Sequence, residues 1–137
     1  MGGINIYCGS FEGEDKSGSA VEGVLDGVEQ MASAPERATI GRIRAALQAG
    51  EDHALIEPTD ARLLLPTLRQ YAVRLDAELS TPGDPLDQIR RDERQSPART
   101  TELQYGESLG WRAYCARDLL RAFETADAES EEVALVW

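Results

Sequence analysis

His53 is the only histidine in the chain, so any Ser-His-Asp or Cys-His arrangement would have to use it. No nucleophile elbow or similar motif supplies a nucleophile for such an arrangement. The residue follows Glu51 and Asp52 in a polar stretch, which is typical of a solvent-exposed side chain. We therefore interpret His53 as a surface residue and predict no catalytic residue.

The two cysteines, Cys8 and Cys115, do not form a metal motif. Together with His53 they match no zinc-ligand spacing. Two thiols this far apart in an intracellular chain are typically buried and reduced. We predict no metal at these residues and favour two reduced thiols over the alternative, a disulfide between them.

Two further segments resemble ligand-binding loops only in part. Residues 12–18 are acidic, but they depart from the ligand order of an EF-hand and contain Lys16 at their centre. The pattern Gly23-x-x-x-Gly27 lacks the Lys-Ser/Thr ending of a phosphate-binding loop, and its glycines lie within a helical pattern. We therefore predict no cofactor.

The 137 residues include 25 acidic and 14 basic ones, which gives a net charge of −11. Pairs of carboxylates are unavoidable at this acid content, so they do not identify a hydrolase. An acidic body repels nucleic-acid phosphates and anionic lipid. No apolar run approaches the ~20 residues that span a bilayer. We expect neither a direct nucleic-acid partner nor a membrane partner.

The negative charge is concentrated at the two ends of the sequence. Residues 1–33 and 124–137 each have a balance of −5, whereas residues 34–80 sum to −1 and residues 81–123 to zero. The basic residues are thirteen arginines and one lysine, a composition typical of a GC-rich bacterial genome. The first residues contain no signal peptide, so we expect a cytoplasmic protein.

Periodicity predicts a mainly α fold, a bundle of four to five helices with two or three short strands from the chain ends. We expect it to form one compact domain over residues 1–137, since 42% of the residues are hydrophobic. Residues 11–18 have the composition of a loop, and a turn over 59–65 is expected to end at Pro66. The predicted helices cover 19–32, 34–49, 66–80, 84–96 and 100–128, and the predicted strands cover 4–8, 53–57 and 132–137.

Individual residues refine this prediction. Ser33 and Glu36 have the spacing of a capping box at the start of the helix 34–49. The glycines at 23 and 27 admit a close neighbour to the first helix. Arg112 projects near the apolar face of the long helix, where it must find a carboxylate or extend to solvent. Trp111 is expected in the core. The segment 84–96 has little to bury and is predicted to be a surface helix or mobile.

Pairing of the two terminal strands would bring the acidic ends of the sequence together. Acidic ends also occur simply because they keep proteins soluble. The alternative is a surface that binds a basic protein, since a cationic partner would relieve the repulsion. The residues predicted to bind this partner are Glu12, Glu14, Asp15, Glu129, Glu131 and Glu132, with Trp137 at the terminus.

These features favour a small protein-binding domain, in its most specific form an immunity or antitoxin-type inhibitor that neutralises a basic toxin such as a nuclease. One alternative is an anti-defence protein of a phage or mobile element that mimics nucleic acid. Another is a small carboxylate-dependent enzyme, and the last is a structural or regulatory subunit.

Overall fold

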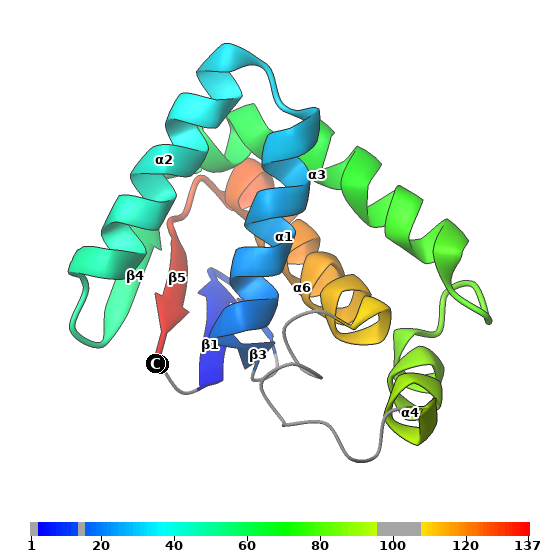
Figure 1. Cartoon of the computed structure of the whole chain (residues 1–137). Helices are drawn as coiled ribbons and strands as arrows, with labels where there is room; N and C mark the ends of the chain where they lie inside the picture. The colour runs from blue at the N-terminus through cyan, green and yellow to red at the C-terminus, as the bar shows by residue number, and fades with distance from the viewer. Residues whose placement is uncertain (1–2, 14–15, 96–107) are drawn as a thin grey trace.

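The computed structural model describes residues 3–13, 16–95 and 108–137. Its described part contains five helices and an antiparallel sheet built partly from the chain ends, which confirms the mainly α class with a minor β component (Figure 1). The elements in chain order are β1 (Gly3–Cys8), β2 (Phe11–Glu12), β3 (Lys16–Ser17), α1 (Gly18–Met31), α2 (Ala34–Ala49), β4 (His53–Ile56), α3 (Pro58–Glu78), α4 (Pro85–Gln95), α6 (Leu109–Glu129) and β5 (Val133–Val136).

The terminal strands pair as predicted. The strand order is β2-β1-β5-β4, and all neighbouring strands are antiparallel. Strand β3 pairs with the first residues of β1, whereas β2 pairs with its last residues. Leu135 is the register partner of Ile6 in β1 and of Ala54 in β4. The predicted third strand near 53–57 is therefore β4, and it supports a terminal pair that would be marginal alone.

The sheet buries one face and leaves the other open to solvent in varying degree. Alternate side chains point into the core, as the period of a half-buried strand requires. The inward residues are Ile4, Ile6, Cys8, Ala54, Ile56, Val133 and Leu135. On the opposite face Tyr7 and Ala134 are half-buried and Leu55 is 47% exposed.

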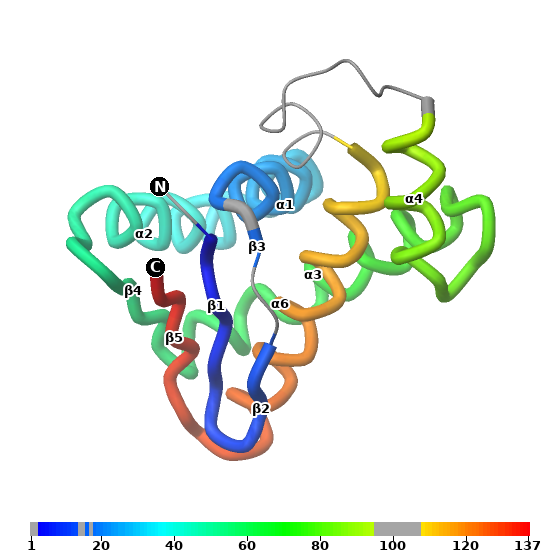
Figure 2. Tube along the Cα trace, turned by 90° about the horizontal axis from the view of Figure 1, so that it is seen from below, coloured from blue at the N-terminus to red at the C-terminus, as the bar shows by residue number. Residues whose placement is uncertain are grey.

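The core lies between this inner face and α1, α2, α3 and α6 (Figures 1 and 2). Helix α6 is buried along most of its length, as its broad apolar pattern predicts, and it packs against α1, α3, α4 and β1. Its Ala116, Leu119 and Phe123 are at most 3% exposed. Arg112 and Trp111, near its start, are only half-buried.

Helix α2 begins and ends where its sequence signals predict. The Ser33 hydroxyl accepts a hydrogen bond from the Glu36 N–H, and the Glu36 carboxylate accepts one from the Ser33 N–H at 3.1 Å. This reciprocal capping box satisfies amide groups at the start of the helix. Gly50 follows the last turn.

The predicted break at Pro66 is wrong, because α3 continues through this residue from Pro58 to Glu78. A proline inside a helix costs about 3 kcal/mol. Leu64, Leu65 and Leu68 around it are all buried, and burial of each is worth about 1.5–3 kcal/mol. Packing therefore outweighs the lost hydrogen bond.

Three other boundaries differ from the predictions. The loop predicted at 11–18 contains β2 and β3, which pair along the edge of β1. The segment 84–96 forms α4, which is packed against α6 through Ile89 and Gly110 rather than mobile. Helix α6 starts at Leu109, and residues 100–107 of the predicted helix lie outside the described residues.

Candidate functional site

Five exposed glutamates gather at one end of the sheet, which we call the acidic end. Strands β1 and β4 finish there and β5 begins there, because β5 is antiparallel to both. Figure 2 shows the β1–β2 turn beside the connection from α6 to β5 at this end. The five residues of the acidic end are Glu12, Glu57, Glu129, Glu131 and Glu132.

Specific contacts hold these segments together. The Ser10 hydroxyl and N–H, in the β1–β2 turn, donate to the Glu129 carboxylate at 2.5 and 3.2 Å. The Cys8 thiol donates to the backbone oxygen of Glu131 at 3.6 Å. The β1–β2 turn is thus fixed to the segment between α6 and β5.

Strand register places Glu57 in the same group. Ile56 of β4 is the partner of Val133 of β5, so the next residues outward are Glu57 and Glu132. Composition offers no sign of this proximity, since Glu57 lies in a nearly neutral part of the chain. The signal that would have found it is the pairing of β4 with β5.

The acidic end has no positive counterpart among the described residues: no arginine, lysine or histidine there lies within ion-pair distance of these five carboxylates. The negative charge of this end also affects the pKa of the nearby Cys8 thiol. Burial raises the pKa of Cys8, and the negative charges of Glu129 and Glu131 raise it further. The contribution of the two glutamates is the effect expected of a concentration of negative charge beside the thiol.

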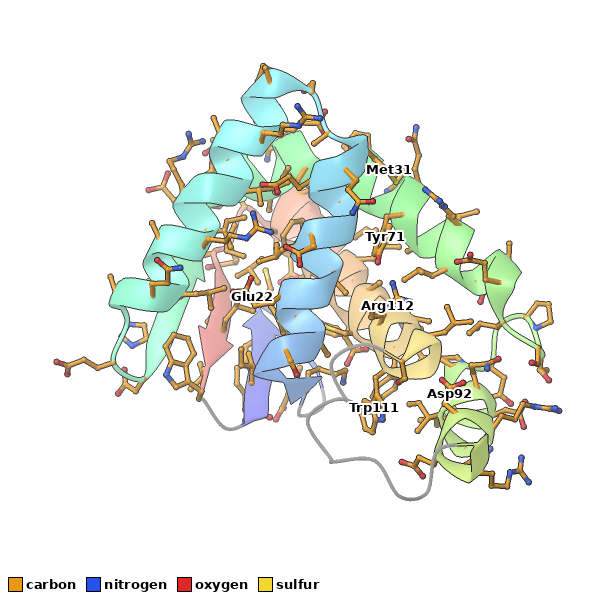
Figure 3. All side chains as sticks on the ribbon, viewed as in Figure 1. Glu22, Met31, Tyr71, Asp92, Trp111 and Arg112 are labelled. Carbon is orange, nitrogen blue, oxygen red and sulfur yellow. The ribbon has the colours of Figure 1, made fainter. Side chains whose placement is uncertain are left out.

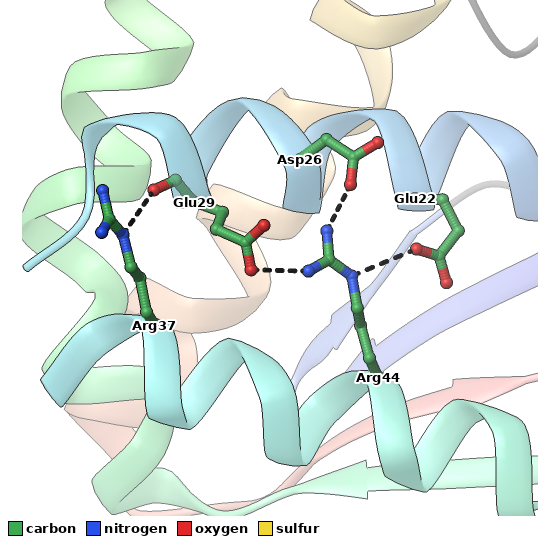
Figure 4. Close-up of polar contacts among 5 residues, drawn as sticks. All are labelled: Glu22, Asp26, Glu29, Arg37 and Arg44. Carbon is green, nitrogen blue, oxygen red and sulfur yellow. Dashed lines mark hydrogen bonds and ion pairs between the residues drawn. The ribbon is translucent and has the colours of Figure 1, made fainter. Parts of the chain in front are cut away.

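A second group of acids, on α1, differs because an arginine offsets part of its charge. Glu22, Asp26 and Glu29 all surround the Arg44 guanidinium of α2 (Figure 4). The Glu22 and Glu29 oxygens lie 3.5 and 2.6 Å from its nitrogens. The high acid content of residues 1–33 is therefore partly cancelled by a residue from another segment.

The remaining predicted binding residues divide in two. Glu14 and Asp15 lie outside the described residues. Trp137 is half-buried and follows β5 at the opposite end from Glu131 and Glu132. Its backbone N–H donates to the backbone oxygen of Asp52 at 2.9 Å. Trp137 and the acidic end therefore cannot form one compact patch.

Apolar side chains lie next to the acidic end on the open face of the sheet. Ala134 has Tyr7 and Leu55 as its register partners on either side, and Tyr7 is in turn the partner of Glu12. Their side chains are half-buried or exposed. An apolar centre with a charged rim is a typical protein-binding surface.

The residues considered for catalysis are placed differently. His53 is exposed, and its Nδ1 lies 2.6 Å from the Asp52 carboxylate. Both cysteines are free and buried, as predicted, and burial raises the pKa of Cys115 to about 12. Within residues 3–13, 16–95 and 108–137, no group of three His, Cys, Asp or Glu side chains is placed to hold a metal ion.

Lys16 occupies an unexpected position, because this charged residue is 1% exposed. Its Nζ lies 2.8 Å from an Asp118 carboxylate oxygen and 3.8 Å from the centroid of the Tyr114 ring. The ion pair therefore fastens β3 to α6 beneath the protein surface. Such a buried pair is a structural link rather than a solvent-accessible reactive site.

Comparison of the chain with known protein families, with functionally characterised proteins and with solved structures finds no significant match. None of the described helices has both the length and the apolar character needed to cross a membrane.

Proposed function

We propose that the protein binds a basic partner protein through the acidic end and thereby inhibits it, in the manner of an immunity protein or antitoxin. The observation that carries this proposal is the gathering of five exposed carboxylates at one end of the sheet, with no cation of the described residues within ion-pair distance. A toxin that acts on nucleic acid, such as a nuclease, presents the basic surface that would complement it.

The acidic end favours association by electrostatics. Like charges held together raise the energy of the free protein, and a cationic surface removes that repulsion on binding. Long-range attraction also increases the association rate by one or more orders of magnitude at low salt. The apolar strip of Tyr7, Leu55 and Ala134 beside the carboxylates supplies surface that can be buried in the complex.

The nucleic-acid mimic receives less support from the same surface. Mimicry requires unpaired carboxylates spaced like phosphates over an extended face. The acids of α1 are instead engaged by Arg44, and the five glutamates of the acidic end cluster at one end of a small sheet. Such a cluster suits a compact basic patch better than a long groove.

The test is affinity capture from the native host with two matched variants. Glu131→Gln/Glu132→Gln removes two charges from the acidic end, while leaving the Ser10–Glu129 contact in place. Glu51→Gln/Glu93→Gln removes two exposed charges elsewhere, from the connection between α2 and β4 and from α4. Wild type and control should retain the same basic protein, and the first variant should lose most of it.

Identification of the captured protein completes this test. The proposal expects a protein of high isoelectric point whose toxic or nucleolytic activity falls when the wild-type chain is added. Capture of only acidic or neutral proteins, or equal retention of a basic protein by both variants, would overturn the assignment of the acidic end.

A further inference from the structure

A solvent-open groove of about 400 Å³ lies between α1, α3 and α6. Two acids line the groove, Glu78 of α3 and Asp26 of α1, and Asp26 is paired with Arg44. The other polar or small lining residues are Gly27 and Gln30 from α1, Tyr71 and Arg74 from α3, and Arg112 from α6. Figure 3 shows the labelled Tyr71 and Arg112 side chains in the space that these helices enclose. The groove uses none of the residues of the acidic end.

The Tyr71 hydroxyl is an unsatisfied donor in this groove. Tyr71 is 5% exposed, and its hydroxyl oxygen is buried without a hydrogen bond of ordinary geometry to any described residue. Burial raises the pKa of Tyr71, and the positive charge of Arg112 together with the polar contact between its guanidinium and the Tyr71 hydroxyl opposes this rise. The phenol is therefore protonated at neutral pH and has an O–H to donate.

One donor of Arg112 is unsatisfied as well, and neither arginine of the groove is neutralised by a carboxylate of the described residues. The buried Nε of Arg112 has no hydrogen-bond partner in the described structure. Neither Arg112 nor Arg74 has a carboxylate within ion-pair distance among the described residues, whereas Arg42, Arg62 and Arg91 each have one and Arg44 has three. Buried donors without acceptors are rare in folded proteins and call for an explanation.

The absence of a side chain at Gly27 of α1 makes room for the Tyr71 ring. A Cβ atom at position 27 would clash with the Cζ, Cε1 and hydroxyl oxygen of Tyr71, so Gly27 is what allows the ring to rest against α1. The hydroxyl is thereby held beside the Arg112 guanidinium. A neutral O–H and a guanidinium side by side form a set of donors that matches the oxygens of a carboxylate or phosphate.

We propose that this groove binds a small molecule through a carboxylate or phosphate group, which accepts hydrogen bonds from the Tyr71 hydroxyl and the Arg112 guanidinium. Arg74 stands at the groove as a second cation for the same group. The volume is in the range of small-molecule sites. The aliphatic side chain of Leu75, which also lines the groove, contacts the remainder of the ligand.

Titration of the intact chain with inorganic phosphate and, separately, with succinate tests this proposal. Sodium chloride holds the ionic strength constant, and the NMR signal of the Arg112 Nε–H group reports binding. We expect at least one of the two anions to shift this signal saturably. A shift with phosphate alone would identify a ligand with a phosphate group, and a shift with succinate alone would identify a carboxylic acid. A shift with both anions would show that the groove accepts either group.

Variants locate the binding. Tyr71→Phe keeps the ring against Gly27 and should weaken the affinity about tenfold, since one hydrogen bond to a charged group is lost. Arg112→Gln should abolish saturation, with binding followed by calorimetry. Arg121→Gln, which removes an exposed arginine of the same helix, should leave the affinity unchanged.

Two results would overturn the proposal. One is the absence of any saturable shift of the Arg112 signal up to about 10 mM of either anion. The other is a wild-type affinity in both Tyr71→Phe and Arg112→Gln. If circular dichroism shows that Arg112→Gln does not fold, the proposal is judged from two other measurements. These are the anion affinity of Tyr71→Phe and the shift of the Arg112 signal in the wild type.

Discussion

At the scale of single residues, packing explains positions whose sequence context gives little guidance. Gly27 weakens α1 as an isolated helix, but it gives the Tyr71 ring room to lie against the helix backbone. The helical pattern and the Gly-x-x-x-Gly spacing indicate a close neighbour, and they do not say which one. Tyr71 comes from 44 residues further along the chain, so only the folded structure identifies it.

Alanine substitutions at two glycines test this packing. Gly41→Ala, in α2, meets no atom within 4 Å and should stabilise the protein by about 0.5–1 kcal/mol through helix propensity. Gly27→Ala has the same propensity gain, but its Cβ displaces Tyr71 and should destabilise the protein by about 1–3 kcal/mol. Urea unfolding measures both, and equal stability of the two variants would contradict this account.

The buried ion pair makes a second prediction at this scale. Lys16→Met leaves the Asp118 carboxylate in the protein interior without its cation, at a cost of about 3–5 kcal/mol. The double variant Lys16→Met/Asp118→Leu removes both charges and should recover at least half of that loss. Chemical denaturation of the three proteins checks this, and a double variant less stable than Lys16→Met would argue against the structural link.

At the scale of elements, local signals predict boundaries well where the cap itself is local. Ser33, Pro35 and Glu36 predict the start of α2 because their hydrogen bonds form within one turn. Pro66 leads to a wrong boundary because the helix hydrogen bond that it removes can be recognised from the local sequence. The burial of Leu64 and Leu68 that compensates for this loss depends on the rest of the fold. The two-residue strands β2 and β3 were missed for the same reason, since they exist only through pairing with β1.

The cap of α2 connects stability to pH. A hydrogen bond from Thr67 lowers the pKa of Glu36 most, bonds from Ser33 lower it further, and partial burial opposes them. A carboxyl group with a lowered folded-state pKa contributes stability above its unfolded pKa of about 4.3, and this contribution is lost as the pH falls through the folded-state value.

Glu36→Gln should therefore be less stable than the wild type by about 1 kcal/mol above pH 5, with a difference that narrows as the pH falls below about 4. Unfolding curves across this pH range measure the effect. Thr67→Val provides the matched control, because it removes the largest cause of the lowered pKa and should reduce the pH dependence. A constant difference between wild type and Glu36→Gln would contradict the assignment.

At the scale of the whole molecule, the distribution of charge is set by topology. The sequence predicts that the terminal strands pair and bring Glu12 near Glu129 and Glu131, and the strand register agrees with that proximity. It does not predict that Glu57 joins them, because a four-residue strand must first pair with β5. Nor does it reveal the groove at Tyr71 and Arg112, whose donors come from separate helices.

Repulsion at the acidic end should be measurable in the free protein. Glu131→Gln/Glu132→Gln is expected to raise the Tm by about 1–3 °C at low salt, because two of the crowded charges are removed. The increase should disappear near 0.5 M salt, where the Debye length is only about 4 Å. Glu51→Gln/Glu93→Gln should show a smaller rise, and an equal rise in both variants would mean that net charge alone is responsible.

The association rate of the captured basic partner with wild-type protein, measured by stopped flow at increasing salt, tests the binding role of the acidic end most directly. The account predicts that the rate constant falls at least tenfold between low and high salt. It also predicts that Glu131→Gln/Glu132→Gln associates more slowly with a weaker salt dependence, while Glu51→Gln/Glu93→Gln behaves like the wild type. A rate that is independent of salt, or equally affected by both variants, would contradict it.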